Sequence, residues 1–395
     1  MKKLSFFVAL ATVLLLPACS GSDDSTQPDP TPPVPVISGH IIEVNDYGQP
    51  IPNFTPADMK AAGFDYGDLL NVKIGSDIEL DNLPYVTSFN EVAILGLLYV
   101  DYNAHGDDYG FGMLNGDFHY YVGGEVGDTV VMTLQQKGGY NTTYELMKSV
   151  YQEERRPDET AEQYANFREI TTTGIAPGVL YRSSNPLNCV KNPGRYAVAD
   201  SLAQSVGINT EIDLADTPEK VREYMATDGY AATYCPKLFN GGNTMACGMM
   251  ANTFHADFKA KMGEAVRFMI AHKPPYLIHC NEGKDRCGFV SLLLEAFAGA
   301  TLDELCRDYM VTMLNFYHIP DGEESYKLRQ SLSVNRLLWL LCNEEALDDF
   351  KSITWDYNLS DLEGQVQPAA EKYLKECGLS DEECSQLRAI LSNKE

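Results

Sequence analysis

Cys280 and Arg286, six positions apart, enclose a short polar segment whose residue types could bind and attack a phosphoryl group. Apolar residues 276–278 precede the cysteine, and apolar residues recur at helical spacing over 289–297. The pattern predicts a buried strand, a tight loop and a helix that ends at Gly299. The loop amides and the positive end of the helix dipole would form an anion site. There the Arg286 guanidinium would bind phosphate oxygens in pairs, and the Cys280 sulfur would lie below the phosphorus.

The same amides would stabilise Cys280 as a thiolate, which is the nucleophilic form of cysteine. A buried structural cysteine beside a surface arginine is the competing interpretation. The cysteine, the glycine at position 283, the charged loop residues and the helix start all agree with the phosphate site. We therefore favour thiolate chemistry on a phosphomonoester.

Residues 279–288 resemble the phosphate loop of a bacterial tyrosine-phosphatase family within the cysteine-based phosphatase superfamily. That loop reads His-Cys-x-x-Gly-Lys-Asp-Arg-Thr/Ala-Gly, and the matching residues here are His279, Cys280, Gly283, Lys284, Asp285, Arg286 and Gly288. Cys287 differs, because the superfamily usually has a hydroxyl there that hydrogen-bonds the thiolate. The resemblance implies an α/β fold with a central, mostly parallel sheet flanked by helices. It implies no metal and no other cofactor.

The resemblance also implies in-line phosphoryl transfer to Cys280, followed by hydrolysis of the phosphocysteine. Arg286 would bind the phosphate and the charge of the transition state. Asp285 would protonate the leaving oxygen, because the loop at 240–253 contains no Asp or Glu. A helix-capping carboxylate is the competing interpretation of Asp285. The reserve candidates for the acid are Asp213 and Asp216.

Other loop residues would support the site. We expect Glu282 to hold the Arg286 guanidinium in place. Lys284 would add a cation at the rim that could contact a second acidic group, with an exposed lysine as the alternative. We expect His279 to orient the loop through hydrogen bonds rather than act as a base. Further substrate contacts are predicted from Asn281, Gly283 and Cys287.

The sequence favours phosphotyrosine-type or dual-specificity substrates. Asn281 and Glu282 leave the loop without the ring of basic residues that phosphoinositide phosphatases often need. Phosphoinositides or other small phosphomonoesters are the alternative. Two further alternatives are a non-catalytic phosphate-binding or docking protein on the same fold, which Cys287 and Ala215 favour, and sulfur transfer, against which Asp285 argues.

The first residues have the features of a targeting signal. Two lysines precede an apolar run at 4–16, and Leu-Pro-Ala-Cys at 16–19 resembles a lipobox. The run is too short to span a membrane. We expect a signal peptide at 1–18, lipidation of Cys19 and a Pro-rich tether at 19–38, with a plain secretory peptide as the alternative. The prediction is a lipoprotein of the cell envelope, anchored to a membrane and facing the periplasm or lying on the outer-membrane surface.

The charge of the chain limits its partners. It has 30 basic and 56 acidic residues and a net charge of −26, which argues against nucleic acid as a partner. The expected partner is a phosphorylated substrate.

Residues 39–140 have the composition of a β-rich, barrel-like domain. Its strand-like segments, separated by turn residues, lie at 41–44, 85–87, 93–100, 118–122 and 129–134. The start of this region resembles the start of the C-terminal β-domain of S-adenosylmethionine hydroxide adenosyltransferases. That resemblance excludes the catalytic half of that family, and a spacer or partner-binding role is expected.

Residues 141–395 are predicted as the phosphatase-like domain with C-terminal helices. Asn-Phe-Arg at 166–168, Tyr-Arg-Ser at 181–183 and Asp-Tyr-Met-Val-Thr at 308–312 resemble further motifs of the family. Strands are predicted at 210–214 and 234–239, a lid at 240–250, helices at 196–206, 254–271 and 303–315, and a capping box from Ser380 to Glu383.

Ten cysteines are present. Cys377 and Cys384 could pair, and the absence of a Cys-x-x-Cys motif argues against a zinc ribbon. Cys287 could capture an oxidised Cys280, with a small buried replacement for threonine as the competing interpretation.

Overall fold

The computed structural model describes residues 34–88, 92, 98–102, 109–113, 116–148, 154–191, 193–227, 229–353 and 355–393. The expected signal peptide, Cys19 and most of the tether lie outside these residues, as does most of the strand expected at 93–100. Within the described part of the chain, no helix has both the length and the apolar character needed to cross a membrane.

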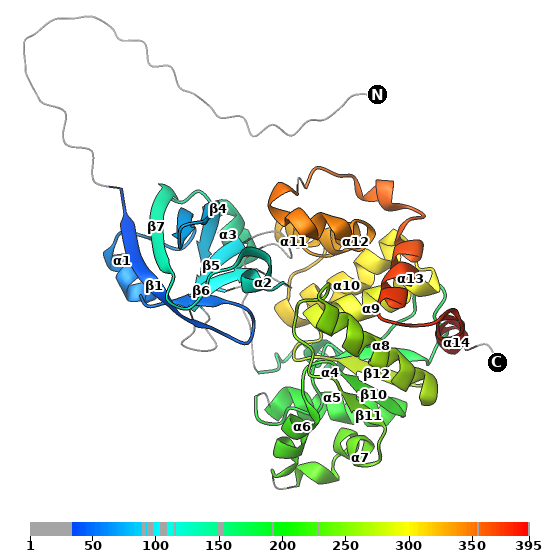
Figure 1. Ribbon diagram of the computed structural model, residues 1–395. Helices are drawn as coiled ribbons and strands as arrows, with labels where there is room; N and C mark the ends of the chain where they lie inside the picture. The colour runs from blue at the N-terminus through cyan, green and yellow to red at the C-terminus, as the bar shows by residue number, and fades with distance from the viewer. Residues whose placement is uncertain are drawn as a thin grey trace, which may run out of the picture. The chain divides into compact units, whose positions relative to one another are not determined.

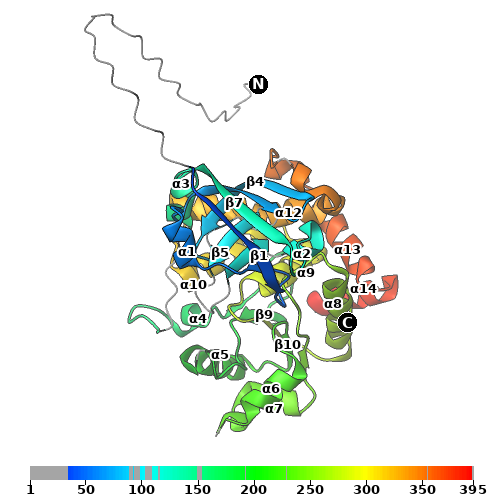
Figure 2. The same ribbon diagram turned by 60° about the vertical axis from the view of Figure 1, so that its left-hand side comes forward.

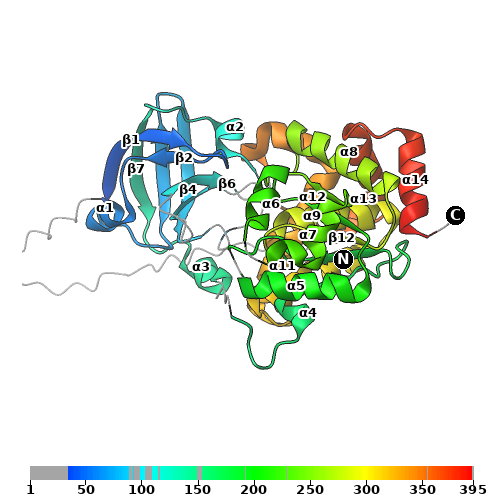
Figure 3. The ribbon, with the colours of Figure 1, turned by 90° about the horizontal axis from the view of Figure 1, so that it is seen from below.

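The first sheet has the strand order β2-β1-β7-β3-β4-β5-β6. Figure 3 shows this sheet from below, with β1, β2, β4, β6 and β7 labelled. The strands of the sheet are β1 (Val36–Val44), β2 (Pro50–Pro52), β3 (Leu69–Ile74), β4 (Ile78–Val86), β5 (Leu98–Tyr102), β6 (Tyr109–Met113) and β7 (Thr129–Gln136). Alternate residues of β3 (Leu70, Val72 and Ile74) are buried, as expected for a strand with one face on a core. A Cβ on Gly110 of β6 would lie 2.8 Å from the Ile51 side chain of β2, so the two outer strands approach each other.

Among the described residues, this sheet is accompanied by the helices α1 (Pro56–Ala61), α2 (Phe118–Val122) and α3 (Asn141–Met147). The strand predicted at 118–122 is therefore wrong. Its aromatic composition is typical of a strand, but the Asp117 side chain accepts a hydrogen bond from the Tyr120 amide and caps a helical turn. Gly123, with φ +102°, ends that turn.

The second sheet has the order β11-β10-β12-β9-β8. Its strands are β8 (Arg168–Glu169), β9 (Leu180–Ser183), β10 (Thr210–Asp213), β11 (Thr244–Ala246) and β12 (Tyr276–His279). Strands β11, β10, β12 and β9 pair in parallel, and β8 pairs antiparallel with β9. All four residues of the central strand β12 are buried, as is usual for a parallel strand covered on both faces.

Helices lie on both faces of this sheet (Figure 1). The helices of this part of the chain are α4 (Ala161–Tyr164), α5 (Pro193–Val206), α6 (Pro218–Met225), α7 (Tyr234–Asn240), α8 (Ala256–Ala271), α9 (Asp285–Ala298), α10 (Leu302–Tyr317), α11 (Glu324–Leu332), α12 (Val334–Cys342), α13 (Val366–Glu376) and α14 (Asp381–Leu391). Leu277 of β12 belongs to a core that includes residues of α5, α6 and α7. Its neighbours Tyr276 and Ile278 belong to the core formed with α8, α9 and α10, because successive strand residues point to opposite faces. Figure 2 shows α14 beside α8, which it contacts.

The strand predicted at 234–239 is wrong, because these residues form α7. Asp200 of α5 accepts hydrogen bonds from the amides of Tyr234 (3.1 Å) and Cys235 (2.6 Å) and so caps the start of this helix. The next strand is β11, within the segment that was predicted as a lid.

Two predictions about helix ends are confirmed. Gly299 has φ +109° and ends α9, and Ser380 and Glu383 form the predicted capping box of α14. Cys377 and Cys384, which could have paired, are both free thiols in the structure.

Candidate active site

The loop between β12 and α9 depends on Gly283. This residue has φ +73°, and a Cβ at its position would lie 2.4 Å from the Ser183 carbonyl oxygen and 2.9 Å from the Asn166 side chain. Only glycine fits such a backbone at so close an approach. The loop is therefore pressed against the end of β9, and α9 begins directly after it at Asp285.

Cys280 and Arg286 lie at the two ends of this loop. Cys280 follows the last residue of β12 and is only 3% exposed. Arg286 is in the first turn of α9, where its Nη1 donates a hydrogen bond to the Met249 carbonyl oxygen at 2.7 Å. The Met249 amide in turn donates to the Leu214 carbonyl oxygen at 2.9 Å. Part of the segment predicted as a lid is thus attached to the end of β10 and contacts the arginine.

Two side chains bind the loop carbonyls from behind. Asn166 Nδ2 donates to the Glu282 carbonyl oxygen at 3.1 Å, and Arg182 Nη2 donates to the Gly283 carbonyl oxygen at 2.8 Å. In a trans peptide the C=O and N–H groups point in opposite directions. The amides of Gly283 and Lys284 therefore face away from these two donors, as an anion-binding loop requires.

A buried ion cluster holds those donors. Asp308 of α10 lies 2.9 Å from Arg168 Nε and 2.7 Å from Arg182 Nη1. Burial opposes ionisation of this carboxyl, but the two guanidinium groups lower the pKa of Asp308 to about 2. Thr312, one turn later, accepts hydrogen bonds from Arg168 and Asn166, each at 3.2 Å. Three motifs noticed in the sequence thus meet behind the loop.

No role in the site was predicted for these cluster residues from the sequence. The available signal was an arginine within two of the family-like motifs, at positions 168 and 182. Arg182 is only 1% exposed. A charge buried this deeply must have a partner, and here the partner comes from α10.

His279 is enclosed by two carboxylates of β10, and all three side chains are fully buried. Its Nε2 lies 3.1 Å from Glu211 Oε1, and its Nδ1 lies 3.8 Å from Asp213 Oδ1. Burial disfavours the imidazolium, but the two carboxylates outweigh it and raise the pKa of His279. These contacts fix the residue before Cys280 to the neighbouring strand, so its role as a base remains disfavoured.

The two reserve candidates for the general acid are occupied by structural hydrogen bonds. Asp213 accepts from the amides of Ala215 and Asp216, at 2.8 Å and 3.1 Å. Asp216 accepts from Asn185 Nδ2 and from the Tyr224 hydroxyl, at 2.8 Å and 3.0 Å. Neither carboxylate belongs to the loop that carries Cys280.

Asp285 is the first residue of α9, and its side chain is 19% exposed. Its Oδ1 is buried and has no hydrogen-bond partner among the described residues, while Oδ2 lies 3.5 Å from Lys284 Nζ. Burial raises the pKa of Asp285, which Lys284 partly offsets. A carboxyl group with a raised pKa retains its proton to higher pH, as a general acid must.

Two expectations about the charged loop residues are wrong. Glu282 was expected to hold Arg286, but it accepts a hydrogen bond from the Tyr317 hydroxyl at 2.5 Å. Lys284 was expected at the rim, but it is 5% exposed and donates to the same hydroxyl at 3.0 Å. Tyr317 is the last residue of α10. No residue near the loop in the sequence predicted that Tyr317 would contact Glu282 and Lys284.

Cys287 is fully buried and lies behind the loop. Its Sγ is 3.4 Å from the Ile278 carbonyl oxygen and 4.0 Å from Ser291 Oγ. Burial raises the pKa of Cys287 to about 11. It is therefore a neutral thiol at physiological pH. Asn281, the remaining predicted contact, is half-buried, and its carbonyl oxygen accepts the Asn185 amide at 3.1 Å.

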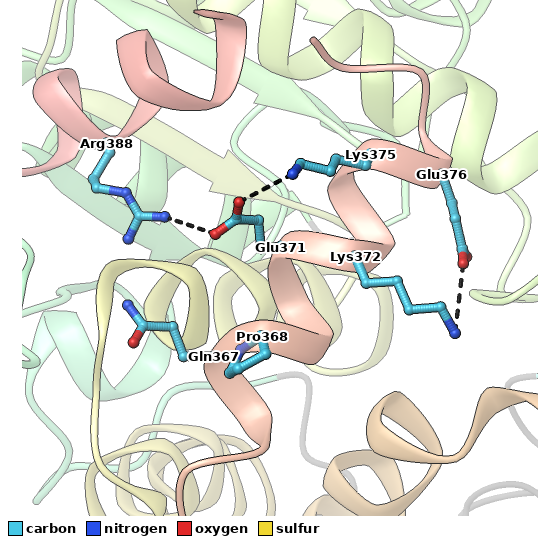
Figure 4. Close-up of a pocket in the computed structure, with 7 residues that line it drawn as sticks. All are labelled: Gln367, Pro368, Glu371, Lys372, Lys375, Glu376 and Arg388. Atoms are coloured by element: carbon cyan, nitrogen blue, oxygen red, sulfur yellow. Dashed lines mark hydrogen bonds and ion pairs between the residues drawn. The ribbon is translucent and has the colours of Figure 1, made fainter. Parts of the chain in front are cut away.

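An open pocket of about 770 Å³ lies on α13 and α14 and contains none of the loop residues (Figure 4). Arg388 and Lys375 both face Glu371, at 3.2 Å and 3.3 Å, and Lys372 lies 3.7 Å from Glu376. Because each of these cations is paired, the pocket offers an anion little net charge, and the Cys280 loop remains the candidate site.

The described residues contain no group of three or more His, Cys, Asp and Glu side chains placed to hold a metal ion. The comparison with known proteins agrees with the choice of the Cys280 loop as the candidate site. A model of the tyrosine phosphatase family matches residues 160–393, which include β8 to β12 and the whole loop. A search of curated proteins found no match to the chain.

Proposed function

The chain belongs to the tyrosine phosphatase family, and we propose that it hydrolyses phosphomonoesters through a phosphocysteine intermediate on Cys280. The observation that carries this proposal is the arrangement of Cys280 and Arg286 at the two ends of a loop whose carbonyls are bound from behind. Its substrates are phosphotyrosine-type phosphomonoesters or the phosphomonoesters that dual-specificity phosphatases hydrolyse.

In the first step the Cys280 thiolate attacks the phosphorus, and the bond from phosphorus to the leaving oxygen breaks. The amides of Gly283 and Lys284 and the start of α9 stabilise the phosphoryl oxygens. Arg286 uses one N–H for the Met249 carbonyl, and its planar guanidinium has further donors for two phosphoryl oxygens.

The leaving oxygen takes its proton from Asp285. The burial that raises the pKa of this carboxyl supports the assignment, since the group must be protonated when the substrate binds. In the second step water attacks the phosphocysteine, Asp285 accepts a proton from that water, and Cys280 leaves as the thiolate.

The test is hydrolysis of an aryl phosphate by the purified full-length chain, in the presence of a chelator and a reductant. Wild type should be active, and Cys280→Ser should lose all measurable turnover while keeping its thermal unfolding temperature. Activity that survives in Cys280→Ser would reject the mechanism. Inactive wild type that still binds vanadate would favour the alternative, a phosphate-binding docking protein.

We also propose that lipidation of Cys19 anchors the chain to a membrane of the cell envelope, as the lipobox-like sequence at 16–19 suggests. Detergent-phase partitioning of the full chain tests this. Cys19→Ala should move the protein to the aqueous phase, and unchanged partitioning would reject the anchor.

A further inference from the structure

The two carboxylates of the phosphate loop are more exposed than its lysine. Glu282 and Asp285 have side chains that are 24% and 19% exposed, whereas the Lys284 side chain is 6% exposed. An approaching substrate therefore meets the Glu282 carboxylate beside the loop before it meets the ammonium group of Lys284.

Lys284 is occupied by contacts within the protein. Its Nζ donates to the Tyr317 hydroxyl at 3.0 Å, lies 3.5 Å from Asp285 Oδ2 and lies 3.9 Å from Glu282 Oε2. It also lies 5.0 Å from the centre of the Tyr317 ring. To reach an anionic group on a substrate, the ammonium would have to leave the Glu282 carboxylate, the Asp285 carboxyl group and the Tyr317 hydroxyl.

Tyr317 links the two loop charges. Its hydroxyl donates to Glu282 Oε2 at 2.5 Å and accepts from Lys284 Nζ. The ring is 4% exposed, so the hydroxyl is held in place by its packing at the end of α10. These two hydrogen bonds hold the Glu282 carboxylate beside the loop and keep the Lys284 ammonium group buried.

Lys284 and Arg286 supply two positive charges, and Glu282 supplies a negative charge. Asp285 is protonated when the substrate binds, so its carboxyl group adds no charge. Arg286 is required for the phosphoryl group itself. A second anionic group on the substrate therefore has no unpaired cation on the loop, and it would lie near the Glu282 carboxylate.

We propose that the Glu282–Tyr317–Lys284 contact is a specificity device. It selects phosphomonoesters whose neighbouring groups are neutral or cationic, and it disfavours substrates with a second anionic group beside the phosphate. This inference rests on the proposed function. It extends that function by specifying the charge of the groups that lie beside the phosphate in the substrate. Repulsion between the Glu282 carboxylate and an anionic group in contact with it corresponds to about a tenfold difference in rate.

The experiment compares kcat/KM for three substrates: a phosphotyrosine peptide flanked by lysines, the same peptide flanked by glutamates, and a soluble inositol phosphate with adjacent phosphates. Wild type should favour the lysine-flanked peptide over each of the other two by about tenfold or more. The preference should shrink as ionic strength rises, because salt screens exposed charges. Equal rates, or a preference for either anionic substrate, would overturn the proposal.

Two variants locate the effect. Glu282→Gln removes the exposed charge and should reduce the preference about tenfold. Tyr317→Phe removes the hydroxyl that engages Lys284 and should raise the relative rate on the glutamate-flanked peptide. Glu382→Gln, on the exposed face of α14, is the matched control and should leave the preference unchanged. An unchanged preference in Glu282→Gln would overturn the proposal.

Binding separates this inference from the proposed function. Cys280→Ser cannot form the phosphocysteine, and its dissociation constants for the two peptides should differ by about tenfold in the same direction. Equal affinities would overturn the charge selectivity even if wild type is an active phosphatase. A difference in affinity with an inactive wild type would reject the catalytic proposal and leave the selectivity in place.

Discussion

Arg182 Nη2 donates a hydrogen bond to the Gly283 carbonyl oxygen at 2.8 Å, although 101 positions separate the two residues in the chain. The same guanidinium pairs with Asp308 through Nη1 at 2.7 Å. One buried side chain therefore connects an ion cluster to the peptide that must present its amide to the phosphate. The phosphate loop depends on this connection for its shape.

Replacing that side chain should weaken phosphate binding. Arg182→Lys retains the charge but cannot form both hydrogen bonds, since lysine lacks the planar fork. We expect kcat/KM for an aryl phosphate to fall about 100-fold, and vanadate to bind more weakly, with the fold retained by circular dichroism. Arg222→Lys, exposed on α6, is the control. Unchanged vanadate affinity in Arg182→Lys would contradict this role.

Asp308 should make stability depend on pH in acid. Its folded pKa of about 2 lies below the unfolded value of 3.8, so its contribution of about 2 kcal/mol is present above pH 4 and is lost as the pH falls toward 2. Asp308→Asn should cost about 3–5 kcal/mol at pH 7, because two buried arginines lose their partner. Denaturant unfolding at several pH values measures both effects. A difference between wild type and variant that stays constant from pH 5 to pH 2 would contradict the prediction.

Asp285 should control the alkaline side of the pH profile. A general acid works when protonated, so kcat should fall as the pH rises through the raised pKa of this group. Asp285→Asn should lower kcat about 100-fold, more for poor leaving groups, and should remove that limb. Asp303→Asn, exposed on α10, serves as the control. An equal loss for good and poor leaving groups would assign the acid to another residue.

Cys287 gives the oxidation hypothesis a distinct pH dependence. If Cys280 is oxidised to a sulfenic acid by peroxide, the Cys287 thiolate can displace hydroxide and form a disulfide. Because burial raises the pKa of Cys287 to about 11, the rate should be low at pH 7 and rise about tenfold per pH unit up to pH 9. Mass spectrometry of linked peptides after a peroxide pulse measures this rate. The absence of a 280–287 link at every pH would reject the hypothesis.

The sequence alone located the candidate site and the ends of several elements, because these depend on neighbouring residues. An apolar run followed by Cys280 and a glycine predicted strand, loop and helix, and β12 and α9 have those positions. Gly299 and the Ser380 capping box were predicted correctly for the same reason, since helix caps act over three or four residues.

Only the tertiary structure determined the partners of the charged residues. Asp200 caps α7 from 34 positions away, which turns a segment that resembles a strand into a helix. Tyr317, the last residue of α10, donates a hydrogen bond to Glu282, which was expected to contact Arg286 instead. A buried charge must find a partner, but the sequence does not state which distant side chain the fold brings to it.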